Sequence, residues 1–255
     1  MNSAGKAQHL RDCKSRSRIS ALTAYDYPTA RLLDEAEIDV LLVGDSLGMV
    51  VLGFPDTTHV TMAHMLHHTA AVARAKPRAL VLGDLPIHSY DSAAQALDSA
   101  RQLIAAGADA VKLEGGIEQS DTIRTLRAAS IEVIGHIGML PQQVLEQGGY
   151  RKKGKTAAAA EQLIHDALAL EAAGVCAIVL ESIVPDVAAK ITQAVGVPTI
   201  GIGCGETTCD GEVAVITDLL GSFPWFVPPF ARPEADVAAQ ITSAAKAYRL
   251  RVRGA

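Results

Sequence analysis

The sequence has few aromatic residues and no long hydrophobic run. Aromatic residues make up 4% of its 255 residues, although 49% of the residues are hydrophobic. These are mainly Ala, Val, Ile and Leu, which is usual in a parallel sheet covered by helices. No apolar run is long enough to span a bilayer, and the polar N-terminal 20 residues lack the apolar segment of a secretory signal. We therefore expect a cytoplasmic protein with no membrane partner.

Zinc motifs and basic surfaces are also missing. The four cysteines form no C-x-x-C pair and no cluster with histidine at zinc spacing, which argues against a zinc site. The formal net charge is −5 and no basic stripe runs along the chain, so we expect no nucleic-acid partner. The one basic run, 151–155, lies in a Gly-rich loop and is either a solvated loop or a lid that meets an anionic ligand.

The sequence does contain a repeated unit: a short β-branched run, a turn and an Ala-rich amphipathic stretch. It predicts strands at 19–24, 40–43, 80–83, 110–113, 132–135, 177–180 and 199–202, and a weaker one at 212–216. Helices are predicted at 28–36, 62–75, 92–106, 118–129, 157–173, 186–194 and 236–250. This alternation predicts one α/β domain over residues 1–255, a (β/α)8 TIM barrel. A Rossmann fold is the alternative, but no G-x-G-x-x-G follows the first strand.

Titratable side chains stand at the ends of five predicted strands. Asp45, Asp84 and Glu114 end the second, third and fourth strands, and His136 and Glu181 end the fifth and sixth. One such residue alone could be a helix cap or a surface group. Parallel strands of a barrel direct all these ends to one place, however, so the five together predict an active site.

Three carboxylates directed at one place would repel one another unless a cation neutralised them. Oxygen donors without cysteine favour Mg²⁺ over Zn²⁺, with Mn²⁺ or Co²⁺ as possible substitutes, so Asp45, Asp84 and Glu114 are the candidate metal ligands. Mg²⁺ keeps positions open for a 2-oxo acid, whose ketone it would polarise so as to stabilise an enolate. Lys112, two residues before Glu114 on the same strand face, would add positive charge. Glu181, across the mouth of the barrel, is the candidate general base.

Two of these residues have ordinary structural alternatives. Lys112 could form a salt bridge with a neighbouring acid, and His136 could be a core histidine bonded to the backbone. The two long loops at 44–61 and 138–156 belong to the same face of the barrel and are candidates for lids or binding walls.

Five stretches of the sequence resemble one enzyme family. They are L-T-A-Y-D-Y-P (22–28), D-V-L-L-V-G-D-S-L-G-M-V-V-L-G (39–53), D-A-V-K-L-E-G-G (109–116), G-H-I-G-M-L-P-Q (135–142) and G-I-G-C-G (201–205). From about residue 18 to residue 222 the chain resembles the 3-methyl-2-oxobutanoate hydroxymethyltransferase family, also called ketopantoate hydroxymethyltransferase. The resemblance implies a barrel of the phosphoenolpyruvate/pyruvate type.

The resemblance also implies an activity and a set of site residues. The family transfers a hydroxymethyl group from 5,10-methylenetetrahydrofolate to 3-methyl-2-oxobutanoate, which gives 2-dehydropantoate in pantothenate (coenzyme A) biosynthesis. Family members are commonly homodecamers, so the resemblance implies a homodecamer here. By position, the family's Mg²⁺ ligands are Asp45, Asp84 and Glu114, its substrate contacts are Asp45, Ser46, Asp84, Lys112 and His136, and its proton acceptor is Glu181.

Four positions depart from the family pattern. His59 stands where Pro is usual, Cys204 where Ala is usual, Glu212 where Gln is usual, and Pro228-Pro229 where a basic residue is usual. The last two concern the C-terminal wall of the barrel, so they bear on folate binding and on assembly rather than on the acids.

Two other functions compete with the transferase. A C–C lyase of the same barrel superfamily would generally carry a cysteine in a lid loop, and no cysteine lies in the loops after the second to sixth strands. A non-catalytic binding paralogue would not be expected to keep every acid at the strand ends. Both alternatives are therefore disfavoured.

Overall fold

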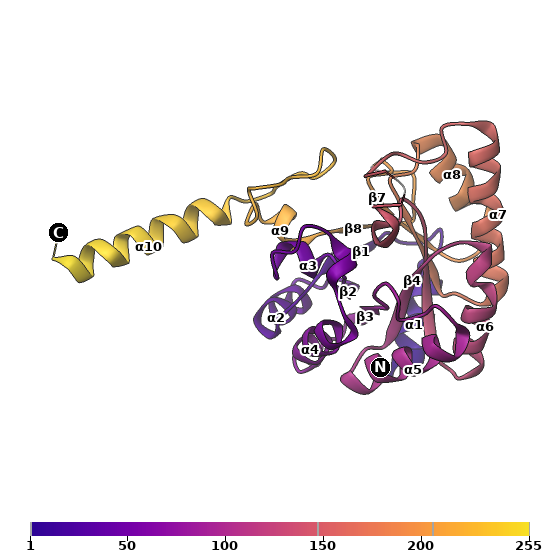
Figure 1. Cartoon of the computed structure of the whole chain (residues 1–255), viewed down its shortest axis with the longest axis horizontal. Coiled ribbons are helices and arrows are strands. Elements are labelled where there is room, and N and C mark those ends of the chain that lie inside the picture. Colours follow the sequence, from indigo (N-terminus) through magenta and orange to yellow (C-terminus); the bar gives the residue numbers. More distant parts are fainter. Residues whose placement is uncertain (1, 147, 206, 255) are drawn as a thin grey trace. The chain divides into compact units, whose positions relative to one another are not determined.

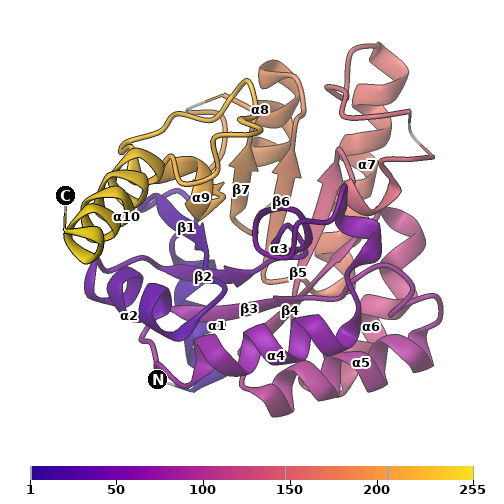
Figure 2. The same ribbon diagram turned by 60° about the vertical axis from the view of Figure 1, so that its left-hand side comes forward.

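Eight parallel strands close into a barrel in the computed structural model, which describes residues 2–146, 148–205 and 207–254. The strands follow one another around the barrel in chain order (Figures 1 and 2). They are β1 (Ile19–Thr23), β2 (Val40–Val43), β3 (Leu80–Asp84), β4 (Ala110–Glu114), β5 (Glu132–Gly138), β6 (Ala177–Glu181), β7 (Thr199–Ile202) and β8 (Gly211–Ala214). The barrel prediction is confirmed, and the open Rossmann sheet is wrong.

Helices alternate with the strands and cover the outside of the barrel (Figure 2). Those of the repeat are α2 (Tyr27–Glu35), α4 (Met62–Ala73), α5 (Ala93–Ala106), α6 (Ser120–Ala128), α7 (Ala157–Ala173) and α8 (Pro185–Ala194). Hydroxyl side chains start three of them: Thr61, Ser92 and Thr156 each accept a hydrogen bond from a backbone N–H in the first turn. Gly107 and Gly174 end α5 and α7 in the left-handed conformation, where glycine is favoured.

The two long loops at the carboxyl ends of the strands contain short helical turns. The loop after β2 holds α3 (Leu47–Val50) and the 3-10 turn η1 (Thr57–His59), and the loop after β5 holds the 3-10 turn η3 (Pro141–Gln143). A further 3-10 turn, η2 (Ile117–Gln119), precedes α6. Turns η1 and η3 pack against each other, so the two long loops meet on the face where the strands end.

A helix that the repeat did not predict lies at the amino-terminal ends of the strands. In α1 (Ser3–Asp12), Lys6 Nζ donates hydrogen bonds to the carbonyls of Pro77 (3.0 Å) and Ala79 (2.9 Å), just before β3. Leu10 of α1 packs into the same buried cluster as the inward-facing side chains of the strands. Cys176 also belongs to this cluster. The helix therefore completes the core at the end of the barrel opposite to the acids.

The register of the strands determines which polar side chains meet. Asp84 of β3 pairs with Lys112 of β4, and Glu114 of β4 pairs with His136 of β5. Strands β3, β4 and β6 each run one residue further than predicted, and β5 runs to Gly138. Asp84, Glu114, His136 and Glu181 are therefore held in the hydrogen-bonded ladder rather than at the start of loops. The extra ladder hydrogen bonds fix the backbones of these four residues more firmly than the predicted strand ends would have done.

The chain divides into two compact units, Met1–Val213 and Ala214–Ala255. The second contains α9 (Ile216–Leu219) and α10 (Val237–Arg253), which are linked where the backbone N–H of Val237 donates to the carbonyl of Leu220 (3.0 Å). No side chain of α10 is buried. The assignment of residues 1–255 to one domain stays a prediction. In the part of the chain that the structure describes, no helix has both the length and the apolar character needed to cross a membrane.

Candidate active site

Asp84, Lys112 and Asp45 form a buried polar group at the ends of β2, β3 and β4. Lys112 Nζ lies 3.1 Å from Asp84 Oδ1, and the backbone N–H of Asp45 donates to Asp84 Oδ2 at 3.1 Å. All three residues are at most 5% exposed. The salt bridge considered for Lys112 is therefore present, and it joins two residues that the sequence assigned to one site.

His136 lies between two carboxylates. Its Nδ1 is 3.6 Å from Glu114 Oε1, and its Nε2 is 3.3 Å from Glu181 Oε2. Lys112 Nζ lies 3.4 Å from the same Nδ1. These neighbours are side chains of the predicted site, so the ring is not a core histidine bonded to the backbone. The five strand ends do converge, as the sequence predicts.

The charges of this group act strongly on one another. Burial raises the pKa of Asp45 to about 8, and the negative charges of Asp84 and Glu114 add to the rise. Burial alone would lower the pKa of Lys112, but the carboxylates of Asp84, Glu114 and Asp45 outweigh it and raise that pKa. Burial and the positive charge of Lys112 both act to lower the pKa of His136. Its contacts with Glu114 and Glu181 outweigh them and raise that pKa to about 9. The carboxylates of Asp45, Asp84 and Glu114 therefore repel one another, and a bound cation would reduce that repulsion.

Asp45, Asp84 and Glu114 supply oxygen donors of the kind that a divalent metal needs. Among the described residues, no three acid, imidazole or thiol side chains already form a ready metal cluster. Asp84 Oδ1 and Glu114 Oε1 are nevertheless buried without a hydrogen bond of good geometry, and the neighbouring acid is Asp45. Asp84 Oδ1 and Glu114 Oε1 face the side chains of Lys112 and His136, so both oxygens already lie where positive charge is placed. Buried carboxylate oxygens of this kind in a group of three acids fit a cation that prefers oxygen, such as Mg²⁺.

Ser46, the other predicted substrate contact, lies at the end of β2 beside Tyr25. The two hydroxyl oxygens are 2.9 Å apart. Tyr25 follows β1 within the L-T-A-Y-D-Y-P stretch, and the sequence reasoning gave it no role. The pair brings the end of β1 into the site.

Gln142 of η3 is the main residue that the sequence reasoning missed. Its side chain amide donates to Asp45 Oδ2 (2.8 Å) and to the Leu85 carbonyl (3.0 Å), and it accepts a bond from Tyr90 Oη (2.6 Å). Its backbone N–H donates to Glu114 Oε2 at 3.1 Å. Gln142 is the last residue of the G-H-I-G-M-L-P-Q stretch, which was the available signal.

The two long loops also meet above the acids. Tyr150 Oη lies 3.8 Å from Met49 Sδ, which joins the loop after β5 to the loop after β2. Burial raises the pKa of Tyr150 to about 12, and the charges of Glu181 and Asp45 contribute to that rise. Tyr150 is thus close enough for the charges of Glu181 and Asp45 to act on it. The lid function of the neighbouring basic run stays a prediction.

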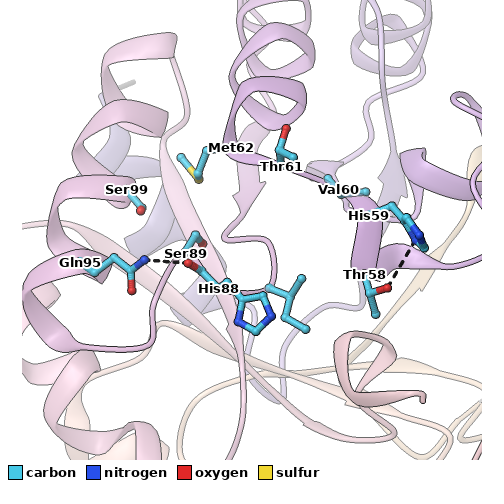
Figure 3. Close-up of a pocket in the computed structure, with 10 residues that line it drawn as sticks. Thr58, His59, Val60, Thr61, Met62, His88, Ser89, Gln95 and Ser99 are labelled. Carbon is cyan, nitrogen blue, oxygen red and sulfur yellow. Dashed lines mark hydrogen bonds between the residues drawn. The ribbon is translucent and has the colours of Figure 1, made fainter. Parts of the chain in front are cut away.

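A separate pocket opens between the loops after β2 and β3 (Figure 3). Its volume is about 340 Å³, and its walls include His59, His88 and Ser99. It contains none of the predicted site residues. Of the family departures, His59 therefore lies outside the acid group, whereas Cys204 is buried and its Sγ donates to the Leu180 carbonyl at 3.1 Å, next to Glu181.

Comparison with known proteins identifies the family. The family model described as ketopantoate hydroxymethyltransferase matches residues 5–255. The chain belongs to this family. The 3-methyl-2-oxobutanoate hydroxymethyltransferase of Ignicoccus hospitalis is 52% identical over 245 residues, which cover 96% of this chain and 92% of that protein. The enzyme of the same name from Hyperthermus butylicus is 53% identical over 237 residues, which cover 92% of this chain and 82% of that protein.

Membership of the ketopantoate hydroxymethyltransferase family makes the chain an enzyme, a hydroxymethyltransferase, with a function consistent with pantothenate biosynthesis. The lyase and the non-catalytic paralogue are correspondingly disfavoured.

Solved structures support the fold. Phosphoenolpyruvate phosphomutase from Streptomyces platensis subsp. rosaceus has a TM-score of 0.68 at 16% identity and covers 100% of this chain and 88% of its own. The structure of 2,3-dimethylmalate lyase, of the PEP mutase/isocitrate lyase superfamily, has a TM-score of 0.64 at 18% identity, and the match covers 98% of this chain and 89% of that one.

Proposed function

We propose that the chain transfers a hydroxymethyl group from 5,10-methylenetetrahydrofolate to 3-methyl-2-oxobutanoate and so forms 2-dehydropantoate. The observation that carries the proposal is the buried group of Asp45, Asp84 and Glu114 facing Glu181 across His136. The family match supplies the identity of the acceptor.

Glu181 is the general base in this proposal. Its side chain is 14% exposed, whereas those of Asp84, Glu114 and His136 are at most 2% exposed, so Glu181 is the acid that a substrate C–H bond can reach. His136 Nε2 lies 3.3 Å from its Oε2 and keeps the carboxylate turned toward the site. Glu181 would take the proton from the carbon next to the ketone.

Lys112 supplies fixed positive charge for the substrate. Its ammonium is buried and held by Asp84, so it needs little reorganisation when negative charge develops on the oxo acid. The Ser46 hydroxyl, placed by Tyr25, would bind the same substrate. The substrate carbon then bonds to the methylene carbon carried by the folate. The bond between that carbon and the folate nitrogen breaks, water supplies the hydroxyl group, and tetrahydrofolate leaves.

Asp45, Asp84 and Glu114 would hold a Mg²⁺ ion. Their donor chemistry fits, and two of their oxygens have no hydrogen bond of good geometry. When bound, the metal would supply Lewis-acid polarisation of the ketone, an effect of several kcal/mol.

We further propose a cytoplasmic homodecamer. Helix α10 supports assembly, since it buries none of its side chains and exposes Ile241, Tyr248, Leu250 and Val252. Exposed apolar side chains on one helix are typical of surfaces that contact another chain. Sedimentation velocity of the purified protein measures the number of subunits, and a monomer at micromolar concentration would exclude the decamer.

Product formation tests the proposed reaction. Purified protein with 3-methyl-2-oxobutanoate, Mg²⁺ and 5,10-methylenetetrahydrofolate should give 2-dehydropantoate, detected by mass spectrometry, and omission of the folate should prevent it. Product in the absence of folate, or none with all components present, would contradict the proposal.

A further inference from the structure

Each of the three acids has one oxygen held by an N–H donor. Gln142 Nε2 donates to Asp45 Oδ2, the Asp45 backbone donates to Asp84 Oδ2, and the Gln142 backbone donates to Glu114 Oε2. The second oxygens, Asp84 Oδ1 and Glu114 Oε1, are buried without a hydrogen bond of good geometry and face Lys112 Nζ at 3.1 Å and His136 Nδ1 at 3.6 Å. The donors therefore decide which carboxylate oxygens remain available to a ligand, and two of the three donors belong to Gln142.

The orientation of the Gln142 amide is itself determined by its neighbours. Its nitrogen faces two acceptors, Asp45 Oδ2 and the Leu85 carbonyl, and its oxygen faces the Tyr90 hydroxyl at 2.6 Å. Turning the amide over would place its oxygen against both acceptors. Gln142 is 3% exposed, so water does not compete freely for these bonds.

These contacts also join several elements of the barrel. Gln142 lies in η3 after β5, while its partners follow or end β2, β3 and β4. Turn η3 packs against η1 from the loop after β2. A single residue, through its side-chain amide and its backbone N–H, thus ties the positions of Asp45 and Glu114 to each other, although these acids come from strands that are not neighbours in the barrel.

We infer that Gln142, oriented by Tyr90, is a positioning residue: by holding one oxygen of Asp45 and one of Glu114, it directs the other oxygen of each acid toward a divalent cation. The inference rests on the metal site of the proposed function. A neutral amide suits the role because it donates to a carboxylate without adding charge of its own. Groups that orient metal ligands by hydrogen bonding typically change metal affinity about 10- to 100-fold when lost.

Calorimetric titration of substrate-free protein with Mg²⁺ tests the inference. Gln142→Met has a similar length and no amide, so it removes the side-chain donor without adding charge. It should bind Mg²⁺ about 10- to 100-fold more weakly than wild type. Tyr90→Phe keeps the amide but releases its orientation, and it should weaken binding about five-fold. The matched control is Gln95→Met. Gln95 donates to the His88 carbonyl and accepts from the Asp91 N–H, away from the acids of the site, so its Mg²⁺ affinity should stay unchanged.

A kinetic comparison separates positioning from packing. Saturating Mg²⁺ should restore much of the solvent-proton exchange of 3-methyl-2-oxobutanoate in Gln142→Met, because the defect lies in metal affinity. Folded Gln142→Met, checked by circular dichroism, with wild-type Mg²⁺ affinity would overturn the inference. If that variant does not fold, wild-type affinity in Tyr90→Phe overturns it instead.

The outcomes also distinguish this inference from the proposed function. Wild-type protein that binds no Mg²⁺ yet forms 2-dehydropantoate overturns the inference and leaves the transfer reaction standing. Wild-type protein that forms no product, but whose Mg²⁺ affinity falls in Gln142→Met, supports the inference and contradicts the reaction.

Discussion

His136 and Glu181 face each other from the neighbouring strands β5 and β6, with Nε2 of the ring 3.3 Å from Oε2 of the carboxylate. On its other side, the ring faces Glu114. The histidine therefore separates an acid assigned to the metal from an acid assigned to proton transfer. This division predicts that the two acids can be disabled independently.

Glu181→Gln should abolish proton removal while leaving ligand binding intact. The amide keeps the shape of the side chain but is not a base, so exchange of the substrate proton should fall at least about 100-fold. Mg²⁺ and oxo-acid affinities, measured by calorimetry, should stay close to wild type. Unchanged exchange in this variant would remove Glu181 as the base.

Asp84→Asn should weaken Mg²⁺ binding. The change removes one negative charge from the acid group and also the partner of Lys112, so two effects reduce the attraction for a cation. The loss should exceed the roughly 10-fold that follows loss of an outer hydrogen-bond partner. Asp121→Asn, at an exposed acid of α6, is the control. A calorimetric titration of Asp84→Asn identical to that of wild type would refute the assignment.

The strand-end residues could be predicted because they depend on local pattern and on one general property of parallel barrels. Asp84, Glu114 and Glu181 follow β-branched runs, and the closed sheet brings their strand ends together. Gln142 could not be found in this way. Its partners are Asp45 after β2, Tyr90 after β3 and Glu114 at the end of β4, and nothing in the sequence around Gln142 indicates these distant contacts.

Helix α1 was missed for a related reason. Its side chains are largely polar, and only Ala7 and Leu10 of the helix are buried, which is too few for a clear helical period. Its stability comes from the barrel core rather than from its own pattern.

Leu10→Ala should therefore destabilise the whole barrel. Leu10 is 1% exposed within the core cluster, so its truncation should cost about 2–5 kcal/mol in the free energy of unfolding. Urea denaturation measures the change. Gln8→Ala, on the exposed face of the same helix, should change the free energy by no more than about 0.5 kcal/mol. Equal effects of the two substitutions would show that α1 does not complete the core.

Cys204→Ala, which restores the residue usual in the family, should lower stability. Cys204 Sγ donates to the Leu180 carbonyl and accepts from the Ile183 N–H, on either side of Glu181. Loss of these bonds should cost about 1 kcal/mol. Cys204→Ser keeps a donor and an acceptor, so it should retain most of the stability that Cys204→Ala loses. An unfolding curve of Cys204→Ala superimposable on that of wild type would mean that the thiol adds nothing.

The central claim is that the acids at the strand ends form a site that removes a proton from a 2-oxo acid with the help of a divalent metal. NMR of 3-methyl-2-oxobutanoate in D₂O with wild-type protein, with and without Mg²⁺ and in the absence of folate, tests it most directly. The claim predicts that the proton next to the ketone exchanges for deuterium when Mg²⁺ is present and that a chelator stops the exchange. No exchange with Mg²⁺ present, or equal exchange after chelation, would contradict it.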